Sequence, residues 1–264
     1  MNYGARLKHA ATKAPPLLST PARIVEYETI DSTNDEAHRR AAAGERGPLW
    51  IRSDQQQSGR GRSGRPWSSP PGNLSATHLF TPDCPRSVFH HLSFVAGIAA
   101  YDAVAASVDK DAPLQLKWPN DLLIGPAKVG GILVESSKYD DDVVVMIGIG
   151  INIIVTPPVD GRAVTQHGDH RTPPTPSDLG ARLAAAMAHW ISRWDGGRNF
   201  ASVREAWSER AHAIGRPLMV NTNDRQLVGT FDGLAENGAL LLTTEGGETL
   251  RIEHGDVSLV ATSP

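Results

Sequence analysis

Hydrophobic and polar residues alternate along several short segments of this 264-residue chain, a pattern typical of β-strands. Residues 23–29 follow the pattern early in the chain, and the short segments 49–53 and 74–80 are also predicted to be strands. Further apolar runs, separated by turns rich in Pro, Gly and Asp, occur later, at 114–118, 122–124, 131–136 and 143–149. We therefore predict β-strands at these seven segments.

Other segments carry apolar residues at helical spacing. DSTNDEAHRRAAAG (residues 31–44) offers N-cap residues, an acidic first turn and a final glycine, so a helix is predicted there. The alanine-rich segment 86–108 is predicted to be a buried helix, and two more helices are predicted at 178–194 and 200–214. Segment 155–176, rich in Pro, Gly and Thr, is predicted to be an exposed loop, and we assign it no role.

The pattern changes after Gly215, where five short alternating runs lie within about 45 residues. Such runs indicate a small β-barrel or sandwich. Residues 1–20 show no periodicity and are predicted to be flexible. The chain is thus expected to be an α+β protein with a flexible segment at 1–20, a large domain at 21–214 and a small β-domain at 215–264.

The composition narrows the class of protein. Apolar residues make up 40%, charged residues 21%, and the net charge is −3, whereas a nucleic-acid-binding protein is more often strongly basic. One cysteine excludes an internal disulfide and a cysteine-rich zinc site. No apolar run reaches the roughly 18 residues of a membrane span, and the N-terminus lacks a signal-peptide core. A cytoplasmic protein is expected.

The segment QQQSGRGRSGRPWSSPPGN (residues 55–73) contains G-x-G-x-x-G, but it is a poor dinucleotide fingerprint because prolines from Pro66 onward prevent a helix from starting there. Its guanidinium groups suit a phosphate or carboxylate. A glycine-rich segment of this kind could close over an anionic ligand and exclude water. The alternative is a solvated arginine turn whose Trp67 fills the core.

A second segment with several candidate site residues is KWPNDLLIGPAKVGGILVESS (residues 117–137), where polar groups surround a proline-containing turn. Lys128 begins an apolar strand, and a buried ammonium group needs a partner unless it lies at the strand edge and reaches solvent. Downstream, Gly148 and Gly150 alternate with isoleucine and leave space beside a strand. Asn152 ends that run, either as a site residue or as a turn residue.

GRGRSGRPW, KWPNDLLI, KVGGILVE and GIGIN, in this order after an early DSTN, resemble the biotin–protein ligases. The resemblance runs from about residue 28 to the C-terminal β-domain. It implies a mixed-sheet catalytic domain like those of class II aminoacyl-tRNA synthetases and biotin synthetases, followed by an SH3-like barrel. It also implies that biotin and MgATP form biotinyl-5′-AMP, and that a lysine of a biotin carboxyl carrier domain then takes the biotin.

The resemblance also implies residue roles. Biotin would be bound by Ser32, Thr33, Asn34, Gln56, Arg60, Gly61, Arg62 and Lys128. The nucleotide would be bound by Arg65, Trp67, Lys117, Asn120 and Asn152. Lys128 and Arg62 would stabilise the charge of the transition state, and Asp121 would take a proton from the acceptor lysine. No side chain is expected to hold a structural metal.

Three alternatives remain open. Ser32 and Thr33 also suit plain helix capping. A lipoate or octanoate ligase is a related chemistry, and a non-catalytic nucleic-acid-binding module is an alternative of another class. Because only about 20 residues precede the catalytic pattern, without a winged helix-turn-helix, we expect the monofunctional type, with neither nucleic acid nor membrane as partner.

Overall fold

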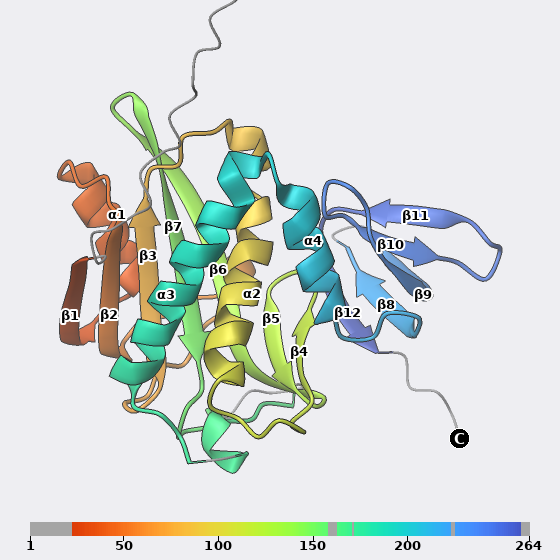
Figure 1. Ribbon diagram of the computed structural model, residues 1–264, viewed down its shortest axis with the longest axis horizontal. Coiled ribbons are helices and arrows are strands. Elements are labelled where there is room, and N and C mark those ends of the chain that lie inside the picture. The colour runs from red at the N-terminus through yellow and green to blue at the C-terminus, as the bar shows by residue number, and fades with distance from the viewer. Residues whose placement is uncertain (1–22, 158–162, 171, 223–224, 260–264) are drawn as a thin grey trace, which may run out of the picture.

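The computed structural model describes residues 23–157, 163–170, 172–222 and 225–259, so the predicted flexible segment 1–20 lies outside the described residues. A seven-stranded mixed sheet forms its centre, in the order β1-β2-β3-β7-β6-β5-β4 (Figure 1). Strands β1 and β2 are parallel and the other pairs are antiparallel. The strands span Arg23–Ile30, Leu49–Gln56, Leu74–Phe80, Leu114–Lys117, Asp121–Ile124, Ala127–Tyr139 and Asp142–Ile151 for β1 to β7. The predicted mixed sheet is confirmed.

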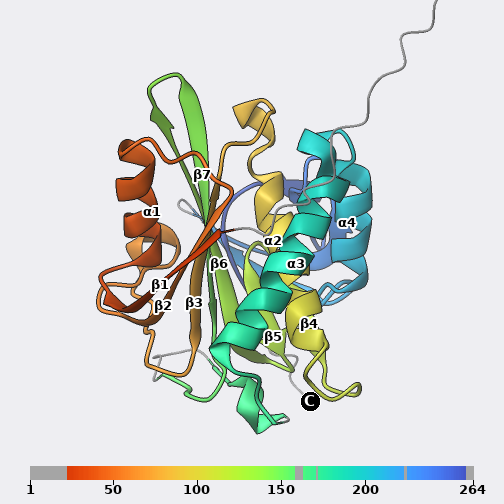
Figure 2. The same ribbon diagram turned by 60° about the vertical axis from the view of Figure 1, so that its left-hand side comes forward.

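Helices cover both faces of this sheet (Figure 2). On one face lie α2 (His91–Ala105), α3 (Pro176–Trp194) and α4 (Phe200–Glu209). Helix α2 is buried on almost all sides because it lies between the sheet and α3, which explains its continuous apolar sequence. On the other face, α1 (Thr33–Ala42) packs Ala37 and Ala41 onto Ile51, Leu79 and Met146.

The C-terminal residues form a separate antiparallel sheet in the order β11-β10-β9-β8-β12. Its strands span Pro217–Asn221, Gln226–Leu234, Leu240–Thr243, Thr249–Ile252 and Asp256–Leu259 for β8 to β12. This sheet contacts the helices of the larger unit. A Cβ on Gly238 would stand 2.8 Å from the Phe94 ring, and Nε1 of Trp118 donates to the Gly238 carbonyl at 3.2 Å. The five predicted C-terminal strands are confirmed.

Two predicted helices are too long. The segment predicted as 86–108 starts with a 3-10 turn (Arg86–Val88) and becomes helical only at His91. The helix predicted at 200–214 ends at Glu209, because the chain then runs beside β4: Leu116 donates its N–H to the Arg210 carbonyl and accepts one from His212. Backbone pairing with a strand edge replaces the last helical turn there.

The prediction of an exposed loop at 155–176 is wrong for its middle part. Lys128 donates its N–H to Ala163 and accepts one from Thr165, so this part extends the sheet. Thr165 and His167 are buried. The other short helical turns are Arg62–Gly64, His167–Asp169 and Asp195–Gly197. None of the described helices is long and apolar enough to cross a membrane.

Candidate active site

One cavity of about 400 Å³ brings together every site residue predicted from the sequence. It lies between the glycine-arginine loop, strands β6 and β7, and the start of β12. Its lining includes Ser32, Thr33, Asn34, Gln56, Arg60, Gly61, Arg62, Arg65, Trp67, Lys117, Asn120, Asp121, Lys128 and Asn152. Residues about 120 positions apart in the chain therefore meet at one place.

The glycine-arginine loop, residues 59–67, folds as a small hairpin. Arg60 bridges Pro66, and the Trp67 N–H donates to the Gly59 carbonyl at 2.8 Å. At the tip, Ser63 and Gly64 have φ values of 55° and 70°, the left-handed pair that a two-residue hairpin turn requires. The loop contains a single 3-10 turn and no α-helix starts within residues 59–67, so the prediction that the G-x-G-x-x-G pattern is not a dinucleotide fingerprint is confirmed.

Trp67 fixes one end of the hairpin against the sheet. A Cβ on Gly150 would stand 2.5 Å from two atoms of the Trp67 indole, so only glycine leaves room for the ring. Gly148 has the same function for Asn34, whose Oδ1 would lie 2.5 Å from its Cβ. The prediction that these glycines leave space beside a strand is confirmed, and the space is filled by the protein's own side chains.

A β-bulge directs Lys128 into the cavity. Strand β5 pairs Leu122 with Gly130 and Leu123 with Lys128, so Val129 is an extra residue in β6. In a regular strand, residues 128 and 131 point to opposite faces, and one extra residue brings them to the same face. Accordingly, Nζ of Lys128 lies 3.0 Å from the position of a Cβ on Gly131, which also lines the cavity.

Lys128 is buried, so the alternative of a solvent-exposed lysine at a strand edge is wrong. Its Nζ lies 2.5 Å from Oδ1 of Asp121 and 5.2 Å from the centre of the Trp67 ring. The second oxygen of Asp121 lies 3.4 Å from Nζ of Lys117. A carboxylate shared by two ammonium groups lowers the cost of burying them and leaves a net positive charge here.

Two loop arginines contact the C-terminal sheet. Arg65 pairs with Asp256 at 3.0 Å, and Arg62 approaches the same carboxylate at 3.7 Å. Arg62 also donates to the Gly255 carbonyl at 3.4 Å and to Oδ1 of Asn120 at 3.3 Å. The C-terminal sheet therefore forms part of the cavity wall, and the loop joins it to the larger unit.

The cavity wall around Thr33 consists of uncharged polar groups. Gln56 accepts from the N–H and the hydroxyl of Thr33 at 2.8 and 3.0 Å, and its Nε2 donates to Ser69. Ser32 caps α1 by accepting from the Asp35 N–H at 3.4 Å. Ser32 thus acts as a helix cap and still lines the cavity, whereas the Thr33 hydroxyl is not used for capping.

Asn152 contributes a buried acceptor. Its Nδ2 donates to the Thr165 carbonyl at 3.1 Å, and its N–H donates to Val129. Its Oδ1 has no hydrogen-bond partner among the described residues, although the side chain is buried. A buried acceptor of this kind is costly unless a ligand donor satisfies it.

Several residues of the site were missed by the sequence reasoning. Asp256 and Val257 reach the cavity from the C-terminal sheet, and Pro157 and Val164 reach it from the segment predicted as an exposed loop. Nothing in the local sequence identifies them, because tertiary packing alone brings them there. Within the described ranges, no cluster of three or more His, Cys, Asp or Glu side chains is suited to hold a metal ion.

The cavity wall combines a part with uncharged polar groups and a part with positively charged side chains. Uncharged donors and acceptors form the wall around Thr33, and the cations of the lining are Lys117, Lys128, Arg60, Arg62 and Arg65. Such a cavity suits a molecule with a neutral polar head and a reacting anionic group beside a phosphate. Two anions brought together there would be neutralised by fixed cations.

Two family descriptions match the chain. Residues 27–152 match the biotin/lipoate A/B protein ligase family, and residues 213–260 match the biotin protein ligase C terminal domain. The first match contains the cavity residues of the larger unit except Pro157 and Val164, and the second contains Asp256.

Individual proteins are also similar. The biotin--[acetyl-CoA-carboxylase] ligase of Paracoccus denitrificans is 37% identical over 229 residues, which cover 82% of this chain and 92% of that protein. The corresponding ligase of Mycobacterium tuberculosis is 31% identical over 234 residues, which cover 86% of this chain and 85% of that protein. The biotin protein ligase of Aquifex aeolicus, solved with biotin and ATP, superposes with a TM-score of 0.76 at 22% identity, over 90% of this chain and 99% of that one.

Proposed function

The chain belongs to the biotin protein ligases of the biotin/lipoate A/B protein ligase family, and we propose that it activates biotin with ATP and transfers it to a lysine of a carboxylase carrier domain. One observation carries the proposal: the neutral hydrogen-bonding end around Thr33 and the cations Lys128 and Arg62 line the same cavity. A ureido ring, which is polar and uncharged, suits the first, and a carboxylate meeting a phosphate suits the second.

In the first half-reaction, an oxygen of the biotin carboxylate attacks the α-phosphorus of MgATP, and pyrophosphate leaves. We assign Lys128 and Arg62 to the five-coordinate phosphorus, where negative charge accumulates. Lys128 would exchange its contact with Asp121 for the reacting oxygens. Holding both reactants in line contributes about 7–11 kcal/mol by proximity.

We assign the nucleotide to the cavity wall around Trp67. The indole presents a flat face beside Lys128, and Asn152 offers a buried acceptor for a hydroxyl or amine donor. Lys117 and Arg65 carry the positive charge needed for the β- and γ-phosphates, and Asn120 lies beside Arg62. Mg²⁺ would enter as part of the substrate MgATP, held by its phosphates.

In the second half-reaction, the neutral amine of the acceptor lysine attacks the acyl carbon of biotinyl-5′-AMP, an amide forms and AMP leaves. A free lysine has a pKa near 10.4 and must lose a proton first. We assign this proton to Asp121, the carboxylate closest to Lys128 in the cavity. The closed hairpin would keep water from the mixed anhydride until the carrier arrives.

For the architecture, we propose residues 21–214 as the catalytic domain, of the class II aminoacyl-tRNA synthetase and biotin synthetase type, and residues 215–264 as an SH3-like barrel. The change from α4 to a sheet that begins at Pro217 supports this boundary. Five short antiparallel strands support a barrel. A cytoplasmic location stays a prediction from the sequence.

Biotin-dependent release of pyrophosphate from ATP tests the proposed function. The purified protein should release pyrophosphate with biotin and not with lipoate or octanoate, because the chains of those acids have no ureido ring to engage Thr33 and Gln56. Equal release with lipoate would favour a lipoate ligase. No release with any of the three acids would remove the ligase function.

A further inference from the structure

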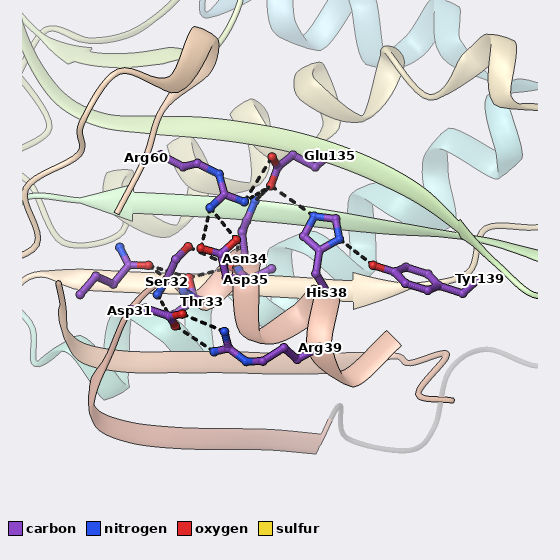
Figure 3. Close-up of polar contacts among 12 residues, drawn as sticks. Asp31, Ser32, Thr33, Asn34, Asp35, His38, Arg39, Arg60, Glu135 and Tyr139 are labelled. Atoms are coloured by element: carbon purple, nitrogen blue, oxygen red, sulfur yellow. Dashed lines mark hydrogen bonds and ion pairs between the residues drawn. The ribbon is translucent and has the colours of Figure 1, made fainter. Parts of the chain in front are cut away.

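Glu135 on β6 is the centre of a polar network just outside the cavity (Figure 3). Its Oε2 accepts from Nδ2 of Asn34 at 2.6 Å and lies 3.4 Å from Nη2 of Arg60. On its outer side, Nε2 of His38 lies 3.7 Å away, and the other ring nitrogen of His38 contacts the Tyr139 hydroxyl at 2.7 Å. Glu135 itself does not line the cavity, but two residues that it contacts do.

The first branch of the network holds the loop. Arg60 is at the base of the hairpin, where it bridges Pro66. Its guanidinium lies between Asp35 of α1, at 2.6 Å, and Glu135 of β6. The hydrogen bond that Arg60 donates to Asp35 raises the pKa of the guanidinium, and the charge of Glu135 adds to this effect. Arg60 thus pairs with two carboxylates from different elements while it lines the cavity, and its place over the biotin tail stays a prediction.

The second branch sets the direction of hydrogen bonds at the ligand. An ionised carboxylate only accepts, so Asn34 must present its Nδ2 to Glu135 and its Oδ1 to Thr77. The Thr77 hydroxyl has one proton and lies 2.6 Å from that Oδ1, which cannot donate. The proton of Thr77 is therefore given to Asn34.

The last member of the second branch is Thr33. Its hydroxyl lies 2.8 Å from that of Thr77 and 3.0 Å from Oε1 of Gln56. Because Thr77 has no proton left and Gln56 offers an oxygen, the Thr33 proton is used inside the protein. Thr33 then offers only lone pairs to the cavity, and it accepts a hydrogen bond from an N–H group of the ligand.

We propose that Glu135 is a positioning residue that couples the two branches. Through Arg60 it holds the base of the glycine-arginine hairpin, and through Asn34 and Thr77 it makes Thr33 an acceptor for an N–H donor. The proposal rests on the proposed function only in naming that donor, which is the ureido ring of biotin. Loss of the Glu135 charge would loosen the hairpin and reverse the polarity of the pocket together.

Glu135→Gln is the direct test because it keeps the shape of the side chain. One end of the new amide is a donor. If its nitrogen takes the place of Oε2, it faces Nδ2 of Asn34, and if it takes the place of Oε1, it faces Nη2 of Arg60. We expect the KM for biotin to rise about tenfold, the effect of losing one charge-assisted hydrogen bond, while the KM for ATP changes less than about twofold. Amide hydrogen exchange of residues 59–67 in the ligand-free protein should become faster.

Glu26→Gln is the matched control, since it removes the carboxylate that Arg52 contacts at 2.9 Å outside the cavity. This variant should keep the wild-type KM and the wild-type loop exchange. The double variant Asn34→Asp with Glu135→Gln exchanges amide and carboxylate, so donors again face acceptors from Arg60 to Thr77. Its KM for biotin should fall most of the way back to the wild-type value. A merely structural role for Glu135 does not predict this recovery.

Wild-type KM for biotin and wild-type loop exchange in Glu135→Gln would overturn the proposal, and so would a double variant that is no better than Glu135→Gln. Failure of the proposed function looks different, because the wild-type protein itself would then release no pyrophosphate. Loop exchange is measured without substrates and tests the Arg60 branch in either case.

Discussion

Nζ of Lys128 lies 2.5 Å from Oδ1 of Asp121, buried in the wall of the cavity that the hairpin covers. The β-bulge at Val129 turns the lysine to this face, and the contact with the carboxylate offsets part of the cost of burying the ammonium group there. We propose that an exchange occurs at this contact during the reaction, in which substrate oxygens replace Asp121 at Lys128 while Asp121 keeps Lys117 as a neighbour.

Lys128→Ala should abolish the formation of biotinyl-5′-AMP while the protein stays folded. The variant loses a fixed cation beside the reacting phosphate, so the rate should fall at least about 10²-fold. Pyrophosphate release measures the rate, and circular dichroism measures the fold. Lys138→Ala, an exposed lysine of the same strand, is the control and should keep wild-type activity. Near-normal turnover without Lys128 would remove it from the mechanism.

Arg62→Gly should release biotinyl-5′-AMP into solution. Arg62 joins the hairpin to Asn120 and to the C-terminal residues Gly255 and Asp256, so its loss opens the cavity to water and to other nucleophiles. With biotin and ATP, labelling of a bystander such as serum albumin should increase about tenfold, the effect of losing one hydrogen bond to a charged group. Arg251→Gly, on the exposed β11, should leave bystander labelling low. Equal labelling by both variants would contradict the retention role.

Gly150→Ala should displace Trp67. The added methyl group would stand 2.5 Å from the indole, far inside van der Waals contact, and such overpacking costs about 1–3 kcal/mol. Because Trp67 forms the proposed nucleotide wall, we expect a raised KM for ATP together with a lower melting temperature. At Gly246 the nearest atom is 3.8 Å from the added methyl, so Gly246→Ala should change neither quantity. An unchanged KM for ATP in Gly150→Ala would exclude Trp67 from the nucleotide site.

His78 should make the protein less stable in mild acid. Burial between the rings of Trp50 and Phe80 lowers the pKa of His78 from 6.5 to about 3. Between these values the unfolded chain binds a proton that the folded protein does not, so stability is present above pH 6.5 and is lost as the pH falls toward 3.

The size of this effect is testable in one variant. At pH 5 the wild-type protein should lose about 2 kcal/mol of unfolding free energy through His78, relative to pH 7.5. His78→Phe keeps the ring stacking and removes the titration, so its unfolding free energy, measured by urea denaturation, should depend less on pH by that amount. His91, whose pKa is lowered to about 4 by burial and by His90, remains in both proteins. If the unfolding free energies of the wild type and His78→Phe depend on pH in the same way, the His78 ring is protonated in the folded protein without loss of stability.

The elements of the fold that the sequence predicts are those with regular local patterns. Strand β3 was predicted with its observed bounds, because segments containing proline flank it on both sides. Helix α4 was predicted five residues too long, since the competing hydrogen bonds with β4 come from a strand more than 80 residues away. Helical periodicity carries no information about such a partner.

The cavity residues were predicted because they lie in five recognisable motifs, but their contacts were not. Nothing in KVGGILVE indicates that Val129 is a bulge, or that Lys128 pairs with Asp121. The pairing of Arg60 with Asp35 and Glu135 was not predicted either, because these carboxylates are brought together by α1 and β6. Asp256 was missed for the same reason, as the packing of two sheets brings it to the cavity.

We propose that Lys128 and Arg62 converge where biotin and ATP are joined. A crystal structure of the protein with a stable analogue of biotinyl-5′-AMP measures this directly. We expect Nζ of Lys128 and the Arg62 guanidinium both within about 3 Å of the oxygens of the acyl-phosphate linkage, with the ureido ring beside Thr33. An analogue bound elsewhere, or a linkage contacted by neither side chain, would contradict the account.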